Sequence, residues 1–282
     1  MKSERAHPAR GEDAGVERKS FVKKIEIPST KGKLAAIVHY PKEKSDRLAV
    51  LCPGYLDTKD YDHLVRLAED LCDRGYAVVR FDPTGTWESE GSLADYNTTQ
   101  QLDDMKSVID RMIKEGGYKN VLVGGHSRGG MTSILYAARD PRISAVLAIM
   151  PPPVLMGTVG AERMEKWKKD GFRTSTRDIP GKKERRGFHV PYSDVEDSRK
   201  YDLLGDVKKI KAPMVLVTGE LDTTVPPEDV KRIFDKANEP KKMIVMEGIG
   251  HNYRNNPDDI KKVDEEVLRG LDEVIAAANL QK

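Results

Sequence analysis

The sequence predicts a doubly wound α/β fold, in which a mostly parallel sheet of eight strands carries helices on both faces. Short, continuous apolar runs recur at residues 48–52, 77–81, 121–123, 145–150, 214–217 and 243–246. Such runs are typical of strands that are buried on both faces of a parallel sheet. Amphipathic segments separate them, and right-handed crossovers would place these helices on both sides of the sheet.

The remaining elements follow from local patterns along the chain. Two early strands are expected at 21–27 and 33–40, joined by a Ser-Thr-Lys-Gly turn. Apolar residues at helical spacing predict helices over 62–74, 98–115, 128–138 and 257–277. Gly75 should end the first of these helices. Thr98 and Gln101 match a capping box at the start of the second, and Pro257 suits the first turn of the last.

Residues 151–205 interrupt the alternation of strands and helices. They contain no buried-strand run, although a simple connection takes ~2–6 residues and a helix ~12. We therefore predict a core formed by 21–150 and 206–282, with 151–205 as an inserted cap. Within the insertion we expect a helix at 160–169, a hairpin within 172–190 and a second helix that starts at a Ser193–Glu196 capping box.

Composition excludes several classes of protein. The chain has 48 Lys and Arg against 46 Asp and Glu, so its net charge of +2 does not predict a nucleic-acid or membrane-surface partner. Its apolar runs fall far short of the ~18 residues of a membrane helix. Residues 1–20 are charged and lack the apolar segment of a secretion signal, which predicts a mobile polar tail. Cys52 and Cys72 lie in apolar runs and are expected to be buried thiols, which favours a cytoplasmic protein.

The strongest chemical signal is the sequence Gly-His-Ser-Arg-Gly at 125–129. It follows the strand at 121–123 and opens the helix at 128–138. A serine at such a sharp turn needs glycine on either side, because a Cβ there would clash with the chain. The turn would present the Ser127 hydroxyl above the carboxyl edge of the sheet, next to free N–H groups of the helix. Ser127 is therefore the candidate nucleophile.

A serine nucleophile needs a base and an orienting carboxylate. His251 follows the last strand, at the sheet edge where open α/β folds bind ligands. The other histidines lie in the tail, an early strand, a helix, beside the serine and in the insertion: His7, His39, His63, His126 and His189. Asp222 follows the preceding strand and is the preferred acid, with Glu220 as the alternative. The chain order Ser, Asp, His is that of the α/β-hydrolases.

Two backbone N–H groups are candidates for an oxyanion hole. One belongs to Arg128, the residue after the serine. The other is expected from the first loop of the parallel sheet, where Pro53-Gly54 precedes Tyr55. An ordinary turn is the alternative interpretation of that loop.

Over about 21–278 the chain resembles the α/β-hydrolase superfamily, and it is similar to bacterial carboxylesterases of the cinnamoyl and feruloyl esterase type and to S33-like hydrolases. The similarity rests on Pro-Gly-Tyr at 53–55, Arg-Phe-Asp at 80–82 with Gly85 and Ser89, the elbow at 125–129, Gly-Glu-Leu-Asp at 219–222 and Gly-His at 250–251. The chain departs from the family at Pro53, where histidine is common, and at 82–87, where Asp-x-Arg-Gly-x-Gly is common. Both changes concern the mouth of the pocket.

The resemblance implies that the insertion caps the nucleophile. Its large apolar residues would then line an acyl pocket together with Tyr55 and Trp87: Met156, Trp167, Phe172, Phe188 and Tyr192. The alternative is that these residues pack the cap onto the sheet. The basic run at 182–186 is expected to be a solvated face, with attraction of anionic substrates as the alternative.

These expectations describe a serine hydrolase, specifically a carboxylesterase that cleaves small to medium acyl or aryl esters through an acyl-enzyme. The same three residues also serve thioesterases, peptidases, C–C hydrolases and acyltransferases. A ligand-binding protein with little turnover is the alternative from another class. No cofactor or metal is expected, the partner is a small-molecule ester, and a homodimer is one option for the oligomeric state.

Overall fold

The computed structural model describes residues 20–155, 157 and 159–280, and its core is one eight-stranded sheet. The strands are β1 (Phe21–Ser29), β2 (Gly32–Tyr40), β3 (Arg47–Cys52), β4 (Ala77–Phe81), β5 (Asn120–His126), β6 (Ile143–Ile149), β9 (Met214–Gly219) and β10 (Lys241–Met246). Their order is β1-β2-β4-β3-β5-β6-β9-β10. Strand β2 is antiparallel to β1 and β4, and the other neighbours are parallel. The predicted mostly parallel, eight-stranded α/β sheet is confirmed.

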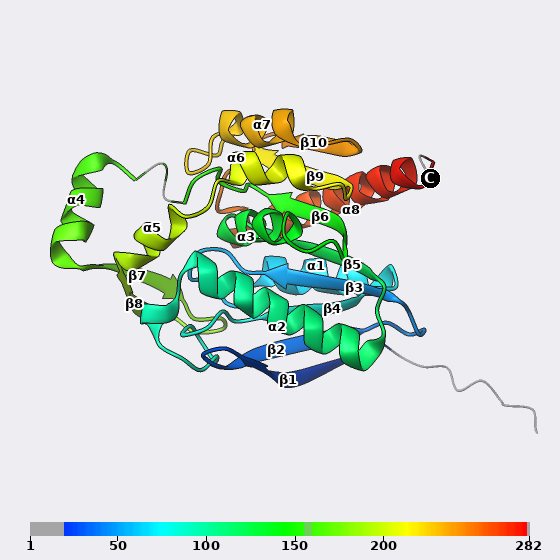
Figure 1. The fold of residues 1–282 in the computed structure, drawn as a ribbon, viewed down its shortest axis with the longest axis horizontal. Helices are drawn as coiled ribbons and strands as arrows, with labels where there is room; N and C mark the ends of the chain where they lie inside the picture. Colours follow the sequence, from blue (N-terminus) through cyan, green and yellow to red (C-terminus); the bar gives the residue numbers. More distant parts are fainter. Residues whose placement is uncertain (1–19, 156, 158, 281–282) are drawn as a thin grey trace, which may run out of the picture.

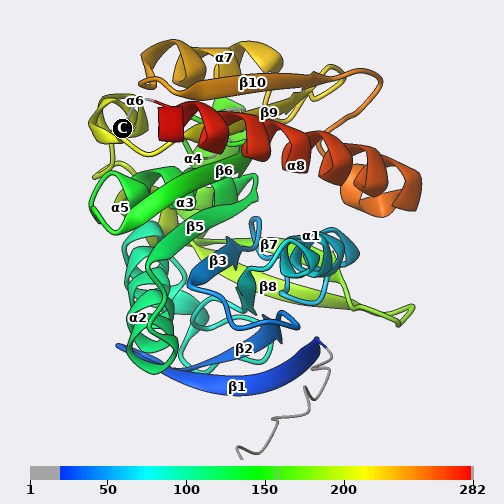
Figure 2. The same cartoon turned by 90° about the vertical axis from the view of Figure 1, so that its right-hand side faces the viewer.

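Helices cover both faces of this sheet. They are α1 (Asp62–Asp73), α2 (Thr98–Gly116), α3 (Arg128–Ala137), α7 (Pro227–Lys236) and α8 (Pro257–Leu280). Helices α1 and α8 bury their apolar sides in one core cluster, and α2, α3 and α7 do so in another. Figure 2 shows α1 and α2 on opposite sides of the central strands. Short 3₁₀ helices occur at Leu93–Asp95, Val207–Lys209 and Tyr253–Asn255.

Strand β3 explains why the apolar runs are continuous. Leu48 and Val50 pack into the cluster on the α2 side, whereas Ala49 and Leu51 pack into the cluster on the α1 side. Successive side chains of a strand point to opposite faces, so a strand covered on both sides needs apolar residues at every position.

Most of the segment between β6 and β9 lies at the left of Figure 1, whereas its last helix returns to the core beside α3. It contains α4 (Ala161–Asp170), β7 (Phe172–Asp178), β8 (Arg185–Pro191), α5 (Ser193–Ser198) and α6 (Leu203–Asp206). Strands β7 and β8 form an antiparallel hairpin that is separate from the main sheet. The helix, hairpin and second helix therefore lie where the sequence predicts them.

Both predicted capping boxes are wrong. Asn97, not Thr98, caps α2, because its extended backbone lets its side chain accept a hydrogen bond of 2.9 Å from the Gln100 N–H. Helix α5 is preceded by Tyr192 and has no side-chain cap, so Ser193 lies inside the helix. The apolar pattern also does not predict α7, which buries only Val230 and Ile233.

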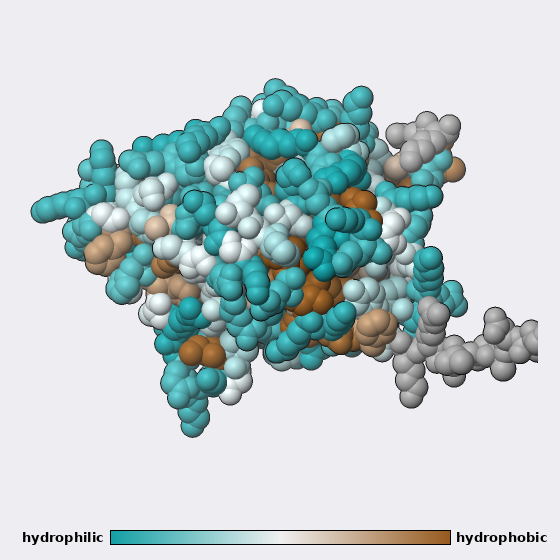
Figure 3. Space-filling view, turned by 60° about the horizontal axis from the view of Figure 1, so that its bottom comes forward, coloured by the Kyte–Doolittle hydropathy of each residue, from teal (hydrophilic) through white to brown (hydrophobic). Residues whose placement is uncertain are grey.

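Other expectations concern the surface and the termini. The predicted tail at 1–20 lies, except for Ser20, outside the described residues. Cys52 and Cys72 are buried free thiols, as expected. Within the described ranges, the helices are all too short or too polar to cross a membrane. Hydrophilic side chains cover most of the face in Figure 3, and hydrophobic surface is limited to small areas between them.

Candidate active site

Ser127 occupies a strained turn between β5 and α3. Its backbone has φ 53° and ψ −121°, a region that residues with a side chain rarely adopt. The turn packs tightly, because a Cβ at Gly125 or Gly129 would lie 2.2 or 2.0 Å from the Cys52 carbonyl oxygen. The Ser127 N–H donates to the Ile149 carbonyl at 2.7 Å. The sequence around Ser127 thus permits a turn that most residues would prevent.

His251 connects Ser127 to Asp222. Its Nε2 lies 3.0 Å from the Ser127 hydroxyl oxygen, and its Nδ1 lies 2.7 Å from Asp222 Oδ2. The Asp222 side chain is fully buried, and its other oxygen accepts the N–H groups of Thr224 and Val225, each at 2.8 Å. These backbone bonds fix the carboxylate, which in turn fixes the imidazole ring.

Glu220, the alternative acid, lies elsewhere. It is exposed, and its carboxylate accepts the Gly248 N–H at 2.9 Å. This bond connects the ends of β9 and β10 without reaching the His251 ring. Of the two acids considered, only Asp222 is hydrogen-bonded to His251.

The Arg128 side chain joins the turn to the insertion. Its guanidinium makes two bonds of 2.7 Å to the buried Asp194 of α5 and one of 3.0 Å to Gln101. Burial alone would lower the pKa of Arg128, but the negative charge of Asp194 raises it above its usual range. No sequence pattern predicts this pair, which anchors α5 beside the residue that follows Ser127.

The two candidate oxyanion donors are the backbone N–H groups of Arg128 and Tyr55. The Arg128 N–H is at the first position of α3, where it has no partner within the helix. Tyr55 follows β3, and its carbonyl accepts two bonds from Arg177 of β7, at 3.0 and 2.7 Å. Among the described residues neither the Tyr55 nor the Arg128 N–H has a hydrogen-bond acceptor. Both amides are therefore available to a ligand.

Ser127 and His251 open into a cavity of about 690 Å³. Tyr55, Arg128 and the β7 residues Arg173, Ser175 and Arg177 contribute to its wall. This volume lies within the usual range for small-molecule sites, ~300–1,000 Å³. The arrangement can activate a serine next to a space that holds a substrate.

Comparison with known proteins identifies the family. The sequence profile described as serine aminopeptidase, S33, matches residues 43–203. The chain is an α/β-hydrolase of this family.

Proteins similar to this S33 hydrolase include one named as a thioesterase and solved structures of the same fold. The mitochondrial palmitoyl-protein thioesterase ABHD10 of Rattus norvegicus is 24% identical over 229 residues, which cover 80% of this chain and 73% of the relative. The structure of Est1E from Butyrivibrio proteoclasticus with ferulic acid has a TM-score of 0.72 and 23% identity, covering 89% of this chain and 99% of Est1E. The α/β-hydrolase GrgF from Penicillium has a TM-score of 0.74 and 21% identity, covering 90% and 99%.

Of the described apolar residues predicted to line an acyl pocket of this S33 hydrolase, only Tyr55 lines the cavity at Ser127. Trp167, Phe188 and Tyr192 are buried in one cluster with Leu56 and Tyr96, and Trp87 packs against it. These four aromatic residues do not line the cavity at Ser127. They pack the insertion onto the core instead, which is the alternative interpretation. The reason is strand alternation, which turns Phe188 of β8 toward the core.

Trp87 and Phe172 also lie outside the cavity wall. The Trp87 indole N–H donates to the Leu56 carbonyl at 2.9 Å and so supports the loop after β3. Phe172 is 47% exposed and packs edge-on against His189. Met156 lies outside the described residues.

A second cavity, of about 440 Å³, adjoins the first. The two share the wall formed by Pro153, Val154 and Leu155. The rest of its wall mixes apolar with polar residues: Met131, Leu135, Met164, Val195 and Leu203 are apolar, and Thr98, Ser198, Arg199 and Tyr201 are polar. Sequence patterns do not predict this space, because its wall combines residues from separate segments of the chain.

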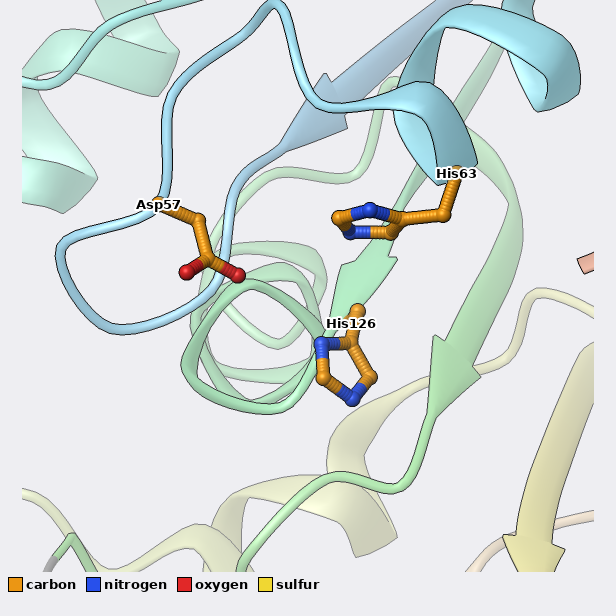
Figure 4. A group of neighbouring side chains, drawn as sticks. All are labelled: Asp57, His63 and His126. Carbon is orange, nitrogen blue, oxygen red and sulfur yellow. The ribbon is translucent and has the colours of Figure 1, made fainter. Parts of the chain in front are cut away.

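One group of described residues has the side chains of a metal site. Asp57, His63 and His126 are buried with their donor atoms within 4.8 Å of one another, and they face each other in Figure 4. Asp57 Oδ1 already accepts Arg254 at 2.7 Å and lies 3.4 Å from Arg177. A divalent cation there would face two guanidinium groups. We therefore assign the group a structural role and no metal.

Proposed function

We propose that this S33 hydrolase cleaves carboxylic esters through an acyl-enzyme on Ser127. The observation that carries the proposal is the continuous Ser127–His251–Asp222 hydrogen-bonded chain at a cavity of about 690 Å³. The Est1E fold, known with ferulic acid bound, supports an ester as substrate. The proposed substrate is a small molecule. A cytoplasmic location and the oligomeric state stay predictions.

The reaction would proceed in two steps. His251 accepts the Ser127 proton as the oxygen attacks the carbonyl carbon, and Asp222 stabilises the imidazolium. The N–H groups of Tyr55 and Arg128 donate to the oxyanion. His251 then protonates the leaving alcohol, and an ester bond to Ser127 remains. Water, deprotonated by His251, attacks this ester, and the acid and free Ser127 are released.

Thioester hydrolysis is the second candidate. The second cavity, which shares the wall at 153–155 with the cavity at Ser127, offers space for a longer acyl chain. The relatives named palmitoyl-protein thioesterase support the same substrate class. The same residues would perform both reactions, since only the leaving atom differs. The leaving group therefore has to be determined by measurement.

A labelling experiment tests the serine. We expect a fluorophosphonate probe to label the wild-type protein and not the Ser127→Ala variant. The same variant should lose several orders of magnitude in kcat/KM on aryl esters. Ser133→Ala is the matched control, because Ser133 lies on the same helix and donates only to the Gly129 carbonyl. Labelling or turnover that survives in Ser127→Ala would overturn the proposal.

A substrate panel then separates the reaction classes. It contains an ester, a thioester and an anilide of the same acyl group, together with aminoacyl anilides. The proposal expects the ester to have the highest kcat/KM. A preference for the thioester would favour the second candidate, and a preference for aminoacyl anilides would mean a peptidase. Labelling without turnover of any substrate would favour a ligand-binding protein.

A further inference from the structure

The wall of the cavity at Ser127 is rich in arginine. Six arginines contribute to it: Arg128, Arg163, Arg173, Arg177, Arg232 and Arg254. Only two carboxylates, Asp57 and Asp229, share the wall. A cavity of this charge, with walls of low dielectric constant, concentrates anions.

Four of these arginines have acidic partners. Arg128 pairs with Asp194, and Arg232 pairs with Asp229. Arg177 and Arg254 share Asp57. Arg163 and Arg173 differ, because no carboxylate of residues 20–155, 157 and 159–280 lies within ion-pair distance of either. Their charges are uncompensated within the described structure.

Strand β7 directs every second residue into the cavity. Arg173, Ser175 and Arg177 alternate along the strand, are all less exposed than their neighbours, and all line the cavity. The Arg173 guanidinium lies 5.6 Å from the centre of the buried Trp167 ring. A guanidinium packed on a ring loses little freedom when it binds an anion.

Tyr55 contributes to the same wall, and its hydroxyl also lacks a partner within the described part of the chain. Tyr55 Oη is buried and has no hydrogen-bond partner among the described residues. Burial, and the nearby charge of Asp194, raise the pKa of Tyr55, so the hydroxyl stays protonated. It is available as a donor, and an unpaired buried hydroxyl is costly until it finds an acceptor. The positive charges of Arg128 and Arg173 partly offset the effect of Asp194 on the pKa of Tyr55.

We propose that Arg163, Arg173 and the Tyr55 hydroxyl form a subsite for a carboxylate or phosphate group of the substrate. The substrate is then an ester or thioester whose acyl or leaving part carries an oxyanion. Guanidinium groups bind such oxyanions through paired N–H donors. The inference rests on the hydrolase function proposed above, since the anion belongs to the molecule that is cleaved.

The test compares substrates that differ only in charge. The first pair is the para-nitrophenyl monoester of glutaric acid and the neutral ester in which an isopropyl group replaces the carboxylate. The second set places the anion on the leaving group: acetyl esters of para-hydroxybenzoate, of a para-hydroxyphenyl phosphate and of a neutral para-substituted phenol. These arms distinguish the acyl side from the leaving side, and carboxylate from phosphate.

In the R163Q/R173Q double variant, we expect the ratio of anionic to neutral kcat/KM to fall about ten- to hundredfold relative to wild type, as for the loss of charge-assisted hydrogen bonds. Arg173→Gln alone should account for most of the fall, because Arg163 is exposed. Arg185→Gln is the control, since this exposed hairpin arginine pairs with Asp178 outside the cavity wall. An unchanged ratio for every pair, or an equal fall in Arg185→Gln, would overturn the subsite.

A binding measurement separates this inference from the proposed function. Calorimetry of the glutarate monoester with Ser127→Ala needs no turnover. We expect binding that weakens with salt, and that weakens further when R163Q/R173Q is added. If the wild type cleaves no ester but this binding is observed, the hydrolase function fails and the subsite stands. If the wild type cleaves neutral esters and Ser127→Ala does not bind the anion preferentially, the subsite alone fails.

Discussion

Ser127 follows a second histidine, and this neighbour affects the charge at the site. The His126 and His251 rings have centres 4.7 Å apart. Burial, then the charges of His251 and His63, lower the pKa of His126 well below its usual value. His126 therefore stays neutral at physiological pH. A neutral neighbour does not repel the imidazolium that His251 would become during the reaction, so the proton is expected on His251.

The role of Asp222 can be tested against Glu220. We expect Asp222→Asn to lower kcat on the order of 10⁴-fold, because the amide favours the wrong His251 tautomer. Glu220→Gln should cost far less, since Glu220 holds only the Gly248 N–H. Steady-state kinetics on one aryl ester measures both variants, and circular dichroism checks that both are folded. A greater loss in Glu220→Gln would contradict the assignment.

For single residues, the sequence predicts the position best where the residue directly follows one strand of the sheet. Ser127, His251 and Asp222 each follow a strand of the parallel sheet, so the topology alone brings them to one edge. The Arg128–Asp194 and Arg254–Asp57 pairs could not be predicted in this way. Their partners are 66 and 197 residues apart, and no spacing rule connects them.

At the scale of elements, the insertion shows what periodicity leaves open. Alternation along β7 and β8 predicts two faces of a hairpin, but it does not say which face is turned toward Ser127. In the structure, Phe188 and Val190 of β8 are buried against the core, and β7 presents Arg173 and Arg177 to the cavity. The expected aromatic acyl pocket was thus misplaced, because hydrophobicity alone does not separate a pocket wall from a packing surface.

The second cavity is the better candidate for an acyl chain, and α4 offers a way to fill it. Met164 is half-buried and contributes to its wall. We expect Met164→Trp to lower the ratio of octanoyl to acetyl ester kcat/KM about tenfold or more, because the larger ring occupies the space of several methylene groups.

Glu165→Trp is the matched control for this change, since Glu165 is exposed on the same helix and does not line the cavity. It should leave the chain-length ratio unchanged. If Met164→Trp also leaves the ratio unchanged, the acyl chain does not enter the second cavity.

At the scale of the whole molecule, buried ionisable groups make stability depend on pH. The net charge of +2 predicts little of this pH dependence, because most surface charges are solvated. Buried His63 has its pKa lowered to about 3, mainly by burial. The unfolded chain therefore binds more protons than the folded one between about pH 3 and 6.5, and His63 destabilises the fold as the pH falls through that window.

Asp264 of α8 has the opposite effect. It is 2% exposed, and its Oδ1 has no hydrogen-bond partner among the described residues. Burial, together with the negative charge of Asp70, raises the pKa of Asp264 to about 8. In an unfolded chain an aspartate titrates near ~3.9. Between these values the folded protein binds the extra proton, so this group makes the free energy of unfolding fall as the pH rises.

Asp264→Asn removes this titration while it keeps the size of the side chain. The variant should therefore gain stability over wild type as the pH rises from about 5 to about 8, by at most ~1.4 kcal/mol per pH unit. Urea unfolding at several pH values measures the difference, with Asp272→Asn as the control, because Asp272 is exposed on the same helix. For Asp272→Asn, the difference from wild type in the free energy of unfolding should stay constant between about pH 5 and about pH 8. If the stability gained by Asp264→Asn over wild type stays constant or shrinks as the pH rises, Asp264 is ionised in the folded protein. It would then have a partner or access to solvent that its burial does not indicate.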